Sequence, residues 1–441
     1  MIRDVKTTWV SADSLARLEC WGVDAHVHVH LTGSHGKLFA LGDLSVRLLE
    51  GIRTSPSKGE EFFTYRPSHI ADMALAVDGE RSEPIRPTDQ NKAVGPGDVV
   101  VSKFLPLRAA WVTQETPRHP VDSNCIRIVG LDVAHGFWIT AVLNHPTVRE
   151  AWAHHARGAT IPRIGLKDLK GFQVPELPNE GGRFAELWLG LESERVKAWN
   201  KLNALLDRAE ELVSEIKALL GGEQKYCFQP APFLSESWLP THVAMRHIQD
   251  EMSRLYWLQL RDVGIAEKNR LRDKGPASGR LLRLSDAEGI LAFRLPKDEL
   301  FREAGFRVYE RPLQPEEVLV SLMGTSPKVV FNHPPRKETI LVSDRWARLH
   351  SMKHPGAVAL MLMTSAVQWQ LRNASSGVAQ QFVTSEDLES IRLPRINDIE
   401  AERMHRHLCT AMDELSAVRA KQQELLAEVE TMITRSMGRL R

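Results

Sequence analysis

A chain of 441 residues is too long for one ordinary domain, and its length favours two to four compact units. Hydrophobic residues make up 43% of the chain and charged residues 26%, a composition typical of a globular protein and not of a disordered one. The formal net charge of +1 argues against a protein that coats nucleic acid through a uniformly basic surface.

The cysteines and the apolar runs predict a cytoplasmic protein. Cys20, Cys125, Cys227 and Cys409 are far apart and form no CxxC pair, so neither a zinc ribbon nor a disulfide framework is expected. No signal-peptide pattern is visible, and the longest apolar run, at 357–363, is too short to span a bilayer. We therefore expect a soluble protein in a reducing compartment.

The first feature in chain order is a run of alternating histidines. GVDAHVHVH at 22–30 would place His26, His28 and His30 on one face of a strand, a geometry that can bind zinc or another divalent metal. No other His-containing stretch, including MHRHL at 404–408, makes a recognisable set with them. Alternating histidines on a half-exposed strand are the favoured interpretation, and a metal-dependent hydrolase that uses this strand is an alternative.

Two segments of the chain recur at a constant spacing. VGPGDVVVS at 94–102, where turn-forming residues lead into a β-branched run, predicts a turn followed by a buried strand. It aligns without gaps with LQPEEVLVS at 313–321, and GATIPRIGLKDLKGFQVP at 158–175 aligns with GVAQQFVTSEDLESIRLP at 377–394. The offset is 219 residues in both cases, which indicates an internal duplication.

Each copy of the repeat is followed by a heptad pattern. Apolar residues recur at alternating spacings of three and four over 184–219, interrupted only by Arg195, and again over 408–432, where Gln422 holds one core position. A homodimerising coiled coil or ordinary bundle helices would give the same pattern. Because a globular unit and a helix alternate twice, mutual pairing of the two helices is favoured. The interface of the pair is expected at Leu202, Leu205, Leu212, Ile216, Leu415, Val418, Leu425 and Val429.

These elements predict an α+β fold. Two similar globular domains would be separated by two long helices that form an antiparallel coiled coil, with a pseudo-two-fold relation between the halves. The expected boundaries are residues 1–178 for the first domain, 179–222 for the central spacer helix, 223–395 for the second domain and 396–441 for the C-terminal helix.

This order of segments resembles the specificity subunit of type I restriction-modification enzymes. In that family two target recognition domains each end in a segment similar to those at 158–175 and 377–394. An earlier strand of the family is similar to GDVVVSK at 97–103 and, less closely, to EEVLVS at 316–321. The chain lacks the glutamine-rich helix start that often follows the closing proline, which suggests a divergent member.

The resemblance implies a DNA sequence-recognition subunit without catalytic residues. Each recognition domain would read one half of a bipartite double-stranded site, the helices would set the gap, and partner subunits would supply the chemistry. The implied partners are two methyltransferase subunits and a restriction or translocase subunit. The chain itself would bind no cofactor, whereas the methyltransferase would use S-adenosylmethionine. A specificity-like subunit of a different phage-defence assembly is the alternative.

Basic and amide side chains are the usual readers of base edges and phosphates. The candidates are Lys103, Arg108, Arg127, Arg163 and Lys167 in the first domain and Lys328, Arg336, Lys337, Arg345 and Gln381 in the second. No nucleotide-binding loop, GxSxG motif or HExxH motif is present. The Asn-Pro-Pro-(Tyr/Phe) motif of the family's methyltransferase partners is also absent. The nearest string, NHPPR at 332–336, has an inserted histidine and lacks the aromatic residue, so it is interpreted as a loop. Catalysis in this chain is therefore not expected.

Overall fold

The computed structural model describes most of both repeats and both heptad helices. The described residues are 38–44, 46–52, 64–71, 73–75, 93–155, 162–219, 257–266, 271–272, 279–288, 291–293, 308–309, 311–324, 327–335, 337–374 and 383–437. The histidine stretch at 22–30 and the candidates Arg336 and Gln381 lie outside them. The described residues pack as two units, one formed by residues up to Ser193 together with those from Arg419 onward, and the other by Glu194–Val418.

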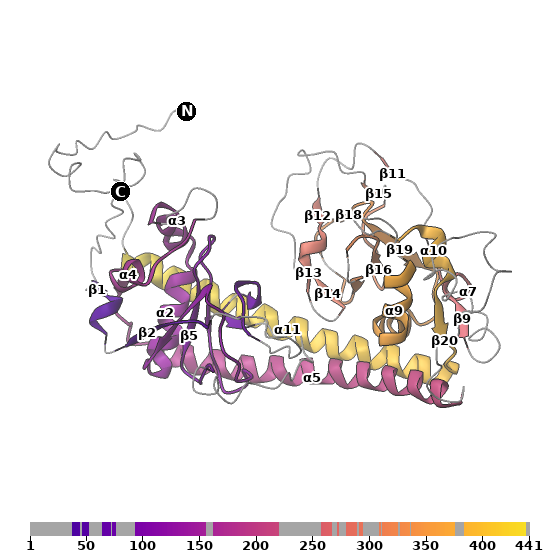
Figure 1. Ribbon diagram of the computed structural model, residues 1–441, viewed down its shortest axis with the longest axis horizontal. Coiled ribbons are helices and arrows are strands. Elements are labelled where there is room, and N and C mark those ends of the chain that lie inside the picture. The colour runs from indigo at the N-terminus through magenta and orange to yellow at the C-terminus, as the bar shows by residue number, and fades with distance from the viewer. Residues whose placement is uncertain are drawn as a thin grey trace. The chain divides into compact units, whose positions relative to one another are not determined.

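The first unit is built on a four-stranded antiparallel sheet of order β2-β7-β5-β6. Figure 1 labels β2 and β5 of this sheet, beside helix α2. Its strands are β1 (Leu38–Ala40), β2 (Arg47–Glu50), β3 (Ile70–Ala71), β4 (Ala74–Leu75), β5 (Val99–Ser102), β6 (Ala109–Trp111), β7 (Cys125–Val129) and β8 (Gln173–Pro175). Its short helices are η2 (Leu41–Asp43), η3 (Pro67–His69), α2 (Val133–Asn144), α3 (Pro146–His155) and α4 (Leu166–Lys170). Val99 and Val101 pack in one core with helix α2, whereas Val100 packs in another with Tyr65 and Ile70. Because both faces of β5 are covered, its sequence is a continuous apolar run.

The second unit repeats this plan with a sheet of order β10-β19-β16-β17. Its strands are β9 (Trp257–Gln259), β10 (Ile265–Ala266), β11 (Leu271–Arg272), β12 (Arg280–Leu282), β13 (Ala287–Glu288), β14 (Ala292–Phe293), β15 (Val308–Tyr309), β16 (Val318–Ser321), β17 (Val329–Phe331), β18 (Ile340–Val342), β19 (Trp346–His350) and β20 (Arg392–Pro394). Its short helices are α7 (Leu260–Val263), η5 (Leu284–Asp286), α8 (Pro355–Met363), α9 (Ser365–Ala374) and α10 (Ser385–Ser390). Val318 and Val320 pack with α8, and Leu319 packs on the other face with Ile340 and Trp346. Both predicted buried strands are thus confirmed.

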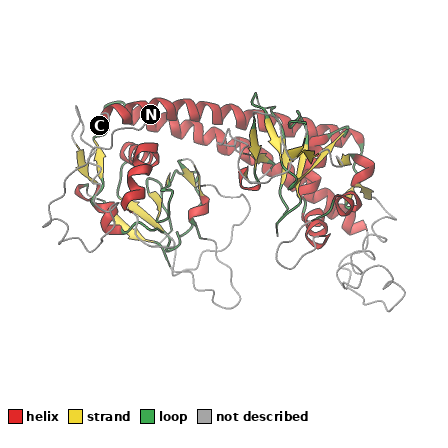
Figure 2. Ribbon diagram, turned by 90° about the horizontal axis from the view of Figure 1, so that it is seen from above, coloured by secondary structure: helices red, strands yellow, loops and turns green. Residues whose placement is uncertain are grey.

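The duplication is visible element by element, with a sheet and its own helices in each unit (Figure 2). The offset of 219 residues relates the first residues of β5 and β16, of β8 and β20, and of α3 and α9. It also relates β1 and β9, each of which pairs antiparallel with the closing strand of its unit: Leu38 lies opposite Pro175, and Trp257 lies opposite Pro394. The closing segment of each repeat therefore completes its domain by pairing with the first described strand.

The Asp-Leu pair that aligns in the two repeats caps a short helix in each unit. Asp168 Oδ2 accepts a hydrogen bond from the Gly165 amide at 3.0 Å, before α4. Asp387 Oδ2 accepts one from the Thr384 amide at 3.2 Å, and the Thr384 hydroxyl accepts one from the Asp387 amide at 3.1 Å, before α10. The leucine after each aspartate is fully buried. The motif therefore combines a helix start with a core anchor.

The heptad segments form two long helices, α5 (Gly181–Leu219) and α11 (Asp398–Met437). In the first unit the beginning of α5, with Trp188, packs in one core with the last turns of α11, with Val429. In the second unit the remainder of α5, with Leu202, packs with the first turns of α11, with Leu408. The start of each helix therefore packs with the end of the other, so the pair is antiparallel, as predicted. No helix in the described part of the chain combines the length and hydropathy needed to cross a membrane.

The α+β fold class with two similar domains and an antiparallel helix pair is therefore confirmed. The expected domain boundaries stay a prediction, because the two compact units divide both long helices between them.

Burial follows the heptad spacing more strictly on α11 than on α5. Of the residues expected at the interface, Leu202, Leu415, Val418, Leu425 and Val429 are buried, Leu205 and Leu212 are half-buried, and the side chain of Ile216 is outside the description. Next to the two half-buried leucines, Leu206 and Val213 are buried instead. A straight helix drifts by about 20° per heptad from a 3.5-residue repeat, so its buried face moves by one position over a few turns.

A polar layer interrupts the apolar helix pair in the first unit. Gln422 is 8% exposed and its Nε2 atom donates a hydrogen bond at 3.3 Å to Oε2 of Glu192, which is 4% exposed. Since each of these side chains would lose a polar partner if the helices slipped, the layer favours one register of the pair.

Candidate nucleic-acid interface

The same three backbone hydrogen bonds gather four segments at one end of the sheet in each unit. In the first unit Ser102 N donates to Arg108 O, Lys103 N to Asn124 O, and Ile164 N to Lys103 O, each at 2.9 Å. These bonds join the end of β5 to the segments before β6, β7 and α4. We call this end of the sheet the strand-end surface.

The second unit repeats the strand-end surface with the equivalent bonds. Ser321 N donates to Lys328 O, Leu322 N to Arg345 O, and Val383 N to Leu322 O, each at 2.8 Å. The positions equivalent to Arg108 and Asn124 are therefore Lys328 and Arg345. Both units place basic residues on the same frame, although the residues themselves differ.

In the first unit four of the five predicted DNA-contacting residues lie at or beside the strand-end surface. Lys103 Nζ is 2.9 Å from Glu50 Oε1, so its charge is partly balanced within the domain. Arg108 is half-buried, and Arg163 is exposed with its Cζ atom 4.9 Å from the centroid of the Phe104 ring. Lys167 is exposed in the first turn of α4. Arg163 and Lys167 are therefore the most open to a ligand.

In the second unit the described candidates divide between the two ends of the sheet. Lys328 is exposed, and its Nζ atom donates to Leu284 O at 2.9 Å and Ala287 O at 3.4 Å. Arg345 is exposed in the turn before β19. Phe331 at the end of β17 pairs with the first residue of β16, so Lys337, which follows β17, leaves from the opposite end of the sheet. The structure therefore brings Lys328 and Arg345 together, but not Lys337.

Arg127 is placed elsewhere, in an ion pair that supports the turn before β5. Its Nε atom is 3.0 Å from Asp98 Oδ2 and its Nη1 atom donates to Ala93 O at 2.7 Å. Asp98 Oδ2 also accepts from the Gly95 amide at 2.8 Å. Burial raises the pKa of the Asp98 carboxyl, and the Gly95 amide and Arg127 oppose that rise. The structure thus gives Arg127 a supporting role in its own domain, and its contact with DNA stays a prediction.

The same arrangement recurs in the second unit around Arg348. Its Nη2 atom is 2.6 Å from Glu317 Oε2 and its Nε atom is 3.0 Å from Glu317 Oε1. The Nη2 atom also donates to Pro312 O at 3.0 Å, and Glu317 Oε2 accepts from the Gln314 amide at 2.9 Å. Asp98 and Glu317 are 219 residues apart, as are Ala93 and Pro312. This network was not predicted from the sequence, although an acid at the same position of both repeats was a signal for it.

These observations define a class of protein: two similar α+β domains and an antiparallel pair of long helices, with basic residues at the same strand-end surface of each domain. No family model and no curated protein matches the sequence. Over more than nine tenths of its length, the chain is similar to solved structures of type I restriction-modification specificity subunits.

Three of these solved structures show the extent of the similarity. The S subunit of the type I system from M. genitalium is 12% identical, with 92% of this chain and 96% of that chain covered and a TM-score of 0.36. The HsdS subunit from Thermoanaerobacter tengcongensis is 15% identical, with 91% and 95% covered and a TM-score of 0.25. A chain from a structure on complex assembly and conformational transition of the type I R-M system is 14% identical, with 93% and 98% covered and a TM-score of 0.25. Because TM-scores this low do not establish a common fold, the role of this chain is inferred from its repeat and its strand-end surfaces.

Proposed function

We propose that the chain is a non-catalytic DNA sequence-recognition subunit. Each repeat reads one half of a bipartite double-stranded site, and the subunit directs a partner DNA methyltransferase and a restriction subunit to that site. The observation that carries the proposal is the pair of strand-end surfaces, where identical backbone bonds hold Arg108 and Arg163 in one unit and Lys328 and Arg345 in the other.

The chemistry of these surfaces suits DNA. Exposed arginine and lysine side chains bind phosphate oxygens, and arginine also pairs with both acceptors of a guanine edge in the major groove. Two copies of one frame carrying different side chains suit a site with two different halves. The alternative without a specific function is a solvated basic surface, which would bind DNA weakly and without sequence preference.

The remaining functions fall to partners. Two methyltransferase subunits would bind the helix pair and the adjacent faces of the domains, with S-adenosylmethionine bound by the methyltransferase and not by this chain. Such a complex would act in the cytoplasm. A specificity-like subunit of a different defence assembly would carry the same surfaces but direct a different enzyme to DNA.

The proposal is tested by the salt dependence of DNA binding. The complex of the chain with its methyltransferase is assayed with Arg163→Ala, Lys328→Ala and the control Arg118→Ala, which removes an exposed charge from the segment between β6 and β7. Each lost phosphate contact should reduce the slope of log affinity against log salt by about 0.9. A lost base contact should instead relax sequence preference at one position of the site. If both surface variants bind every DNA like the control, the strand-end surfaces do not contact DNA and the proposal is wrong.

A further inference from the structure

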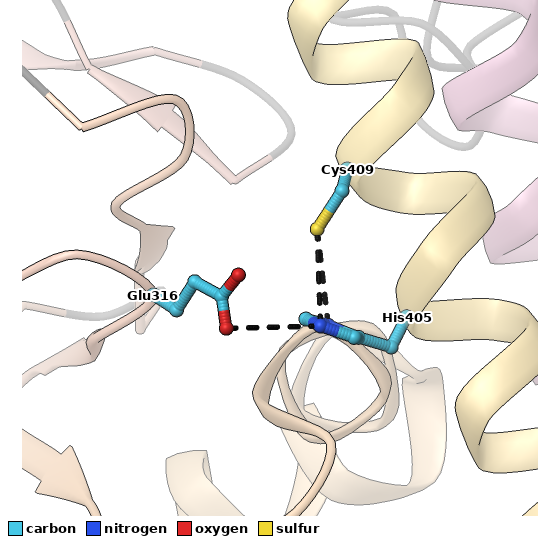
Figure 3. A group of neighbouring side chains, drawn as sticks. All are labelled: Glu316, His405 and Cys409. Carbon is cyan, nitrogen blue, oxygen red and sulfur yellow. Dashed lines mark hydrogen bonds and ion pairs between the residues drawn. The ribbon is translucent and has the colours of Figure 1, made fainter.

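A mixed group of potential metal ligands lies where α11 packs on the sheet of the second unit (Figure 3). Glu316 comes from the turn before β16, and His405 and Cys409 come from successive turns of α11. His405 Nε2 is 3.7 Å from Glu316 Oε2 and 4.0 Å from Cys409 Sγ. One ligand atom from each of the three residues lies within 4.8 Å of the others.

The spacing on the helix suits metal binding. Residues four apart share one face of an α-helix, so His405 and Cys409 point to the same side, and Asp413 continues that face by another turn. Two ligands at this spacing are a recurrent way for a helix to hold zinc. Glu316 then adds a third ligand from a separate element, which a metal site needs in order to be selective.

A second histidine beside the group has unused hydrogen-bonding capacity. His333 stacks on Phe331, with ring centroids 5.8 Å apart, and its side chain is 14% exposed. Its Nε2 atom is 3.1 Å from Asp413 Oδ1, but the angle is not that of a hydrogen bond, and neither ring nitrogen has a hydrogen-bond partner among the described residues. Buried imidazole nitrogens without a partner are uncommon unless a ligand uses them.

The first unit shows that the fold does not need these polar residues. Trp111 is the equivalent of Phe331, because each pairs with the first residue of the central strand. Trp111, Phe137 and Trp188 form an aromatic cluster there: the first two rings meet edge to face at a centroid separation of 5.8 Å, and the last two are tilted at 6.0 Å. Gly97 stands where the second repeat has Glu316. Aromatic side chains therefore fill the space between the long helix and the sheet in the first unit, whereas the second unit has an acid, histidines and a thiol at the equivalent place.

We propose that Glu316, His405 and Cys409 bind one divalent transition-metal ion of the zinc type, which fastens α11 to the turn before β16. Zinc takes sulfur at about 2.3 Å, nitrogen at about 2.0–2.1 Å and carboxylate oxygen at about 2.0–2.2 Å. Tetrahedral angles then place the nitrogen about 3.6 Å from the sulfur and about 3.4 Å from the oxygen. The observed separations exceed these by only a few tenths of an ångström. Water would complete the coordination.

Two adjustments accompany metal binding. His405 Nδ1 accepts a hydrogen bond from the Gly356 amide at 3.1 Å, so the neutral ring carries its proton on Nε2. Ligation through Nε2 moves that proton to Nδ1 and gives up the bond from Gly356. Cys409 Sγ is almost equally far from both ring nitrogens, so its side chain must rotate toward the Nε2 lone pair. One hydrogen bond and one rotamer change are small against the free energy with which zinc binds structural sites.

The ion would also reverse the local electrostatics of the thiol. Burial, with the charges of Glu316 and Asp413, raises the pKa of Cys409 to about 12 when no cation is present. A divalent cation between the thiol and the carboxylates favours the thiolate, and the thiol proton passes to solvent. Metal binding at this group should therefore release protons.

The test uses cobalt as a spectroscopic substitute for zinc in the full chain, stripped of metal by a chelator. Addition of Co²⁺ should produce the thiolate-to-cobalt charge-transfer band with one equivalent bound, and Zn²⁺ should displace it. Cys409→Ser should remove the band, and Glu316→Gln should weaken affinity at least about tenfold. His407→Ala, an exposed histidine on the same helix, is the matched control and should behave like the unaltered chain.

Thermal unfolding with and without metal distinguishes binding from folding defects. Zn²⁺ should raise the Tm of the unaltered chain and of the control, and leave Cys409→Ser unchanged. A cobalt spectrum without the thiolate band would overturn the proposal, because the metal would then be held without Cys409, for example by His26, His28 and His30. A band that persists in Cys409→Ser would overturn it too, because another thiolate, from Cys20, Cys125 or Cys227, would then hold the metal. Neither result would bear on DNA binding through the strand-end surfaces.

Discussion

Breaking the buried ion pair of the second unit should destabilise the protein strongly. Arg348 is fully buried and Glu317 is 3% exposed, and the arginine also donates to the carbonyls of Arg311 and Pro312. Arg348→Met keeps an unbranched side chain but removes the guanidinium, so the exposed Arg311, whose Nη2 atom is 3.1 Å from Glu317 Oε1, remains as the counter-charge of the buried carboxylate. Removing one partner of such a pair costs about 3–5 kcal/mol of folding free energy.

A second substitution should recover part of that loss. Glu317→Gln removes the charge, and its amide oxygen can still accept the hydrogen bond from the Gln314 amide. The double variant Arg348→Met with Glu317→Gln should therefore be more stable than Arg348→Met alone by about 2 kcal/mol. Arg127→Met in the first unit is the matched comparison and should cost less, about 1–3 kcal/mol, since its ion pair with Asp98 is more exposed.

The assay is urea unfolding of the full chain followed by tryptophan fluorescence. Trp346 contributes to the signal of the second unit, because it is buried on the same strand as Arg348. The losses should appear as a shift of the unfolding transition to lower urea. Equal stability of Arg348→Met and the double variant would refute the reasoning, since it would mean that Arg311 alone balances the charge of Glu317.

Three further predictions concern the helix pair and two helix ends. Leu202→Ala should cost about 2–5 kcal/mol in urea unfolding because Leu202 is fully buried in the helix pair, whereas Leu187→Ala at a 45% exposed position of the same helix should cost under about 1 kcal/mol. Burial lowers the pKa of His145, with Glu430 opposing it, so the unfolded state binds the proton more readily. Stability should therefore be full above about pH 6.5 and fall as the pH drops below it, and His145→Gln should flatten that fall in unfolding curves at about pH 5.5 and 7.5. Burial raises the pKa of Asp132, but hydrogen bonds from the amide and ring of His135 outweigh it and lower that pKa overall. The carboxylate therefore caps α2 above about pH 4, and this stabilisation is lost as the pH falls through the lowered pKa of Asp132. Asp132→Ala should accordingly cost about 1 kcal/mol in thermal unfolding at neutral pH and nothing at low pH.

The repeat made much of the fold predictable from the sequence. A constant offset locates both central strands and both closing strands, because duplicated segments keep the same turn and core residues, and the heptads that follow locate both long helices. The heptads predicted the antiparallel pair, including the polar position at Gln422. The burial of Leu206 and Val213, next to half-buried Leu205 and Leu212, was not predicted, since a strict heptad does not follow the drift of the buried face on a straight helix.

The sites were less predictable than the fold. Basic residues were chosen by type alone, and type does not separate Arg127, which is held by Asp98, from the exposed Arg163. The register of β17 also removes Lys337 from the surface on which Lys328 lies. The group of Glu316, His405 and Cys409 depends on packing between distant segments, and only the His-x-x-x-Cys spacing on α11 could have indicated it.

The most direct test of the central claim is to map methylation by long-read sequencing in a methylation-free host that expresses the chain with its methyltransferase. Two chimaeras would carry residues 94–178 or 313–394 of a related specificity subunit. The account predicts a bipartite methylated motif in which each exchange changes one half and leaves the other unchanged. An exchange that alters both halves, or neither, would contradict it.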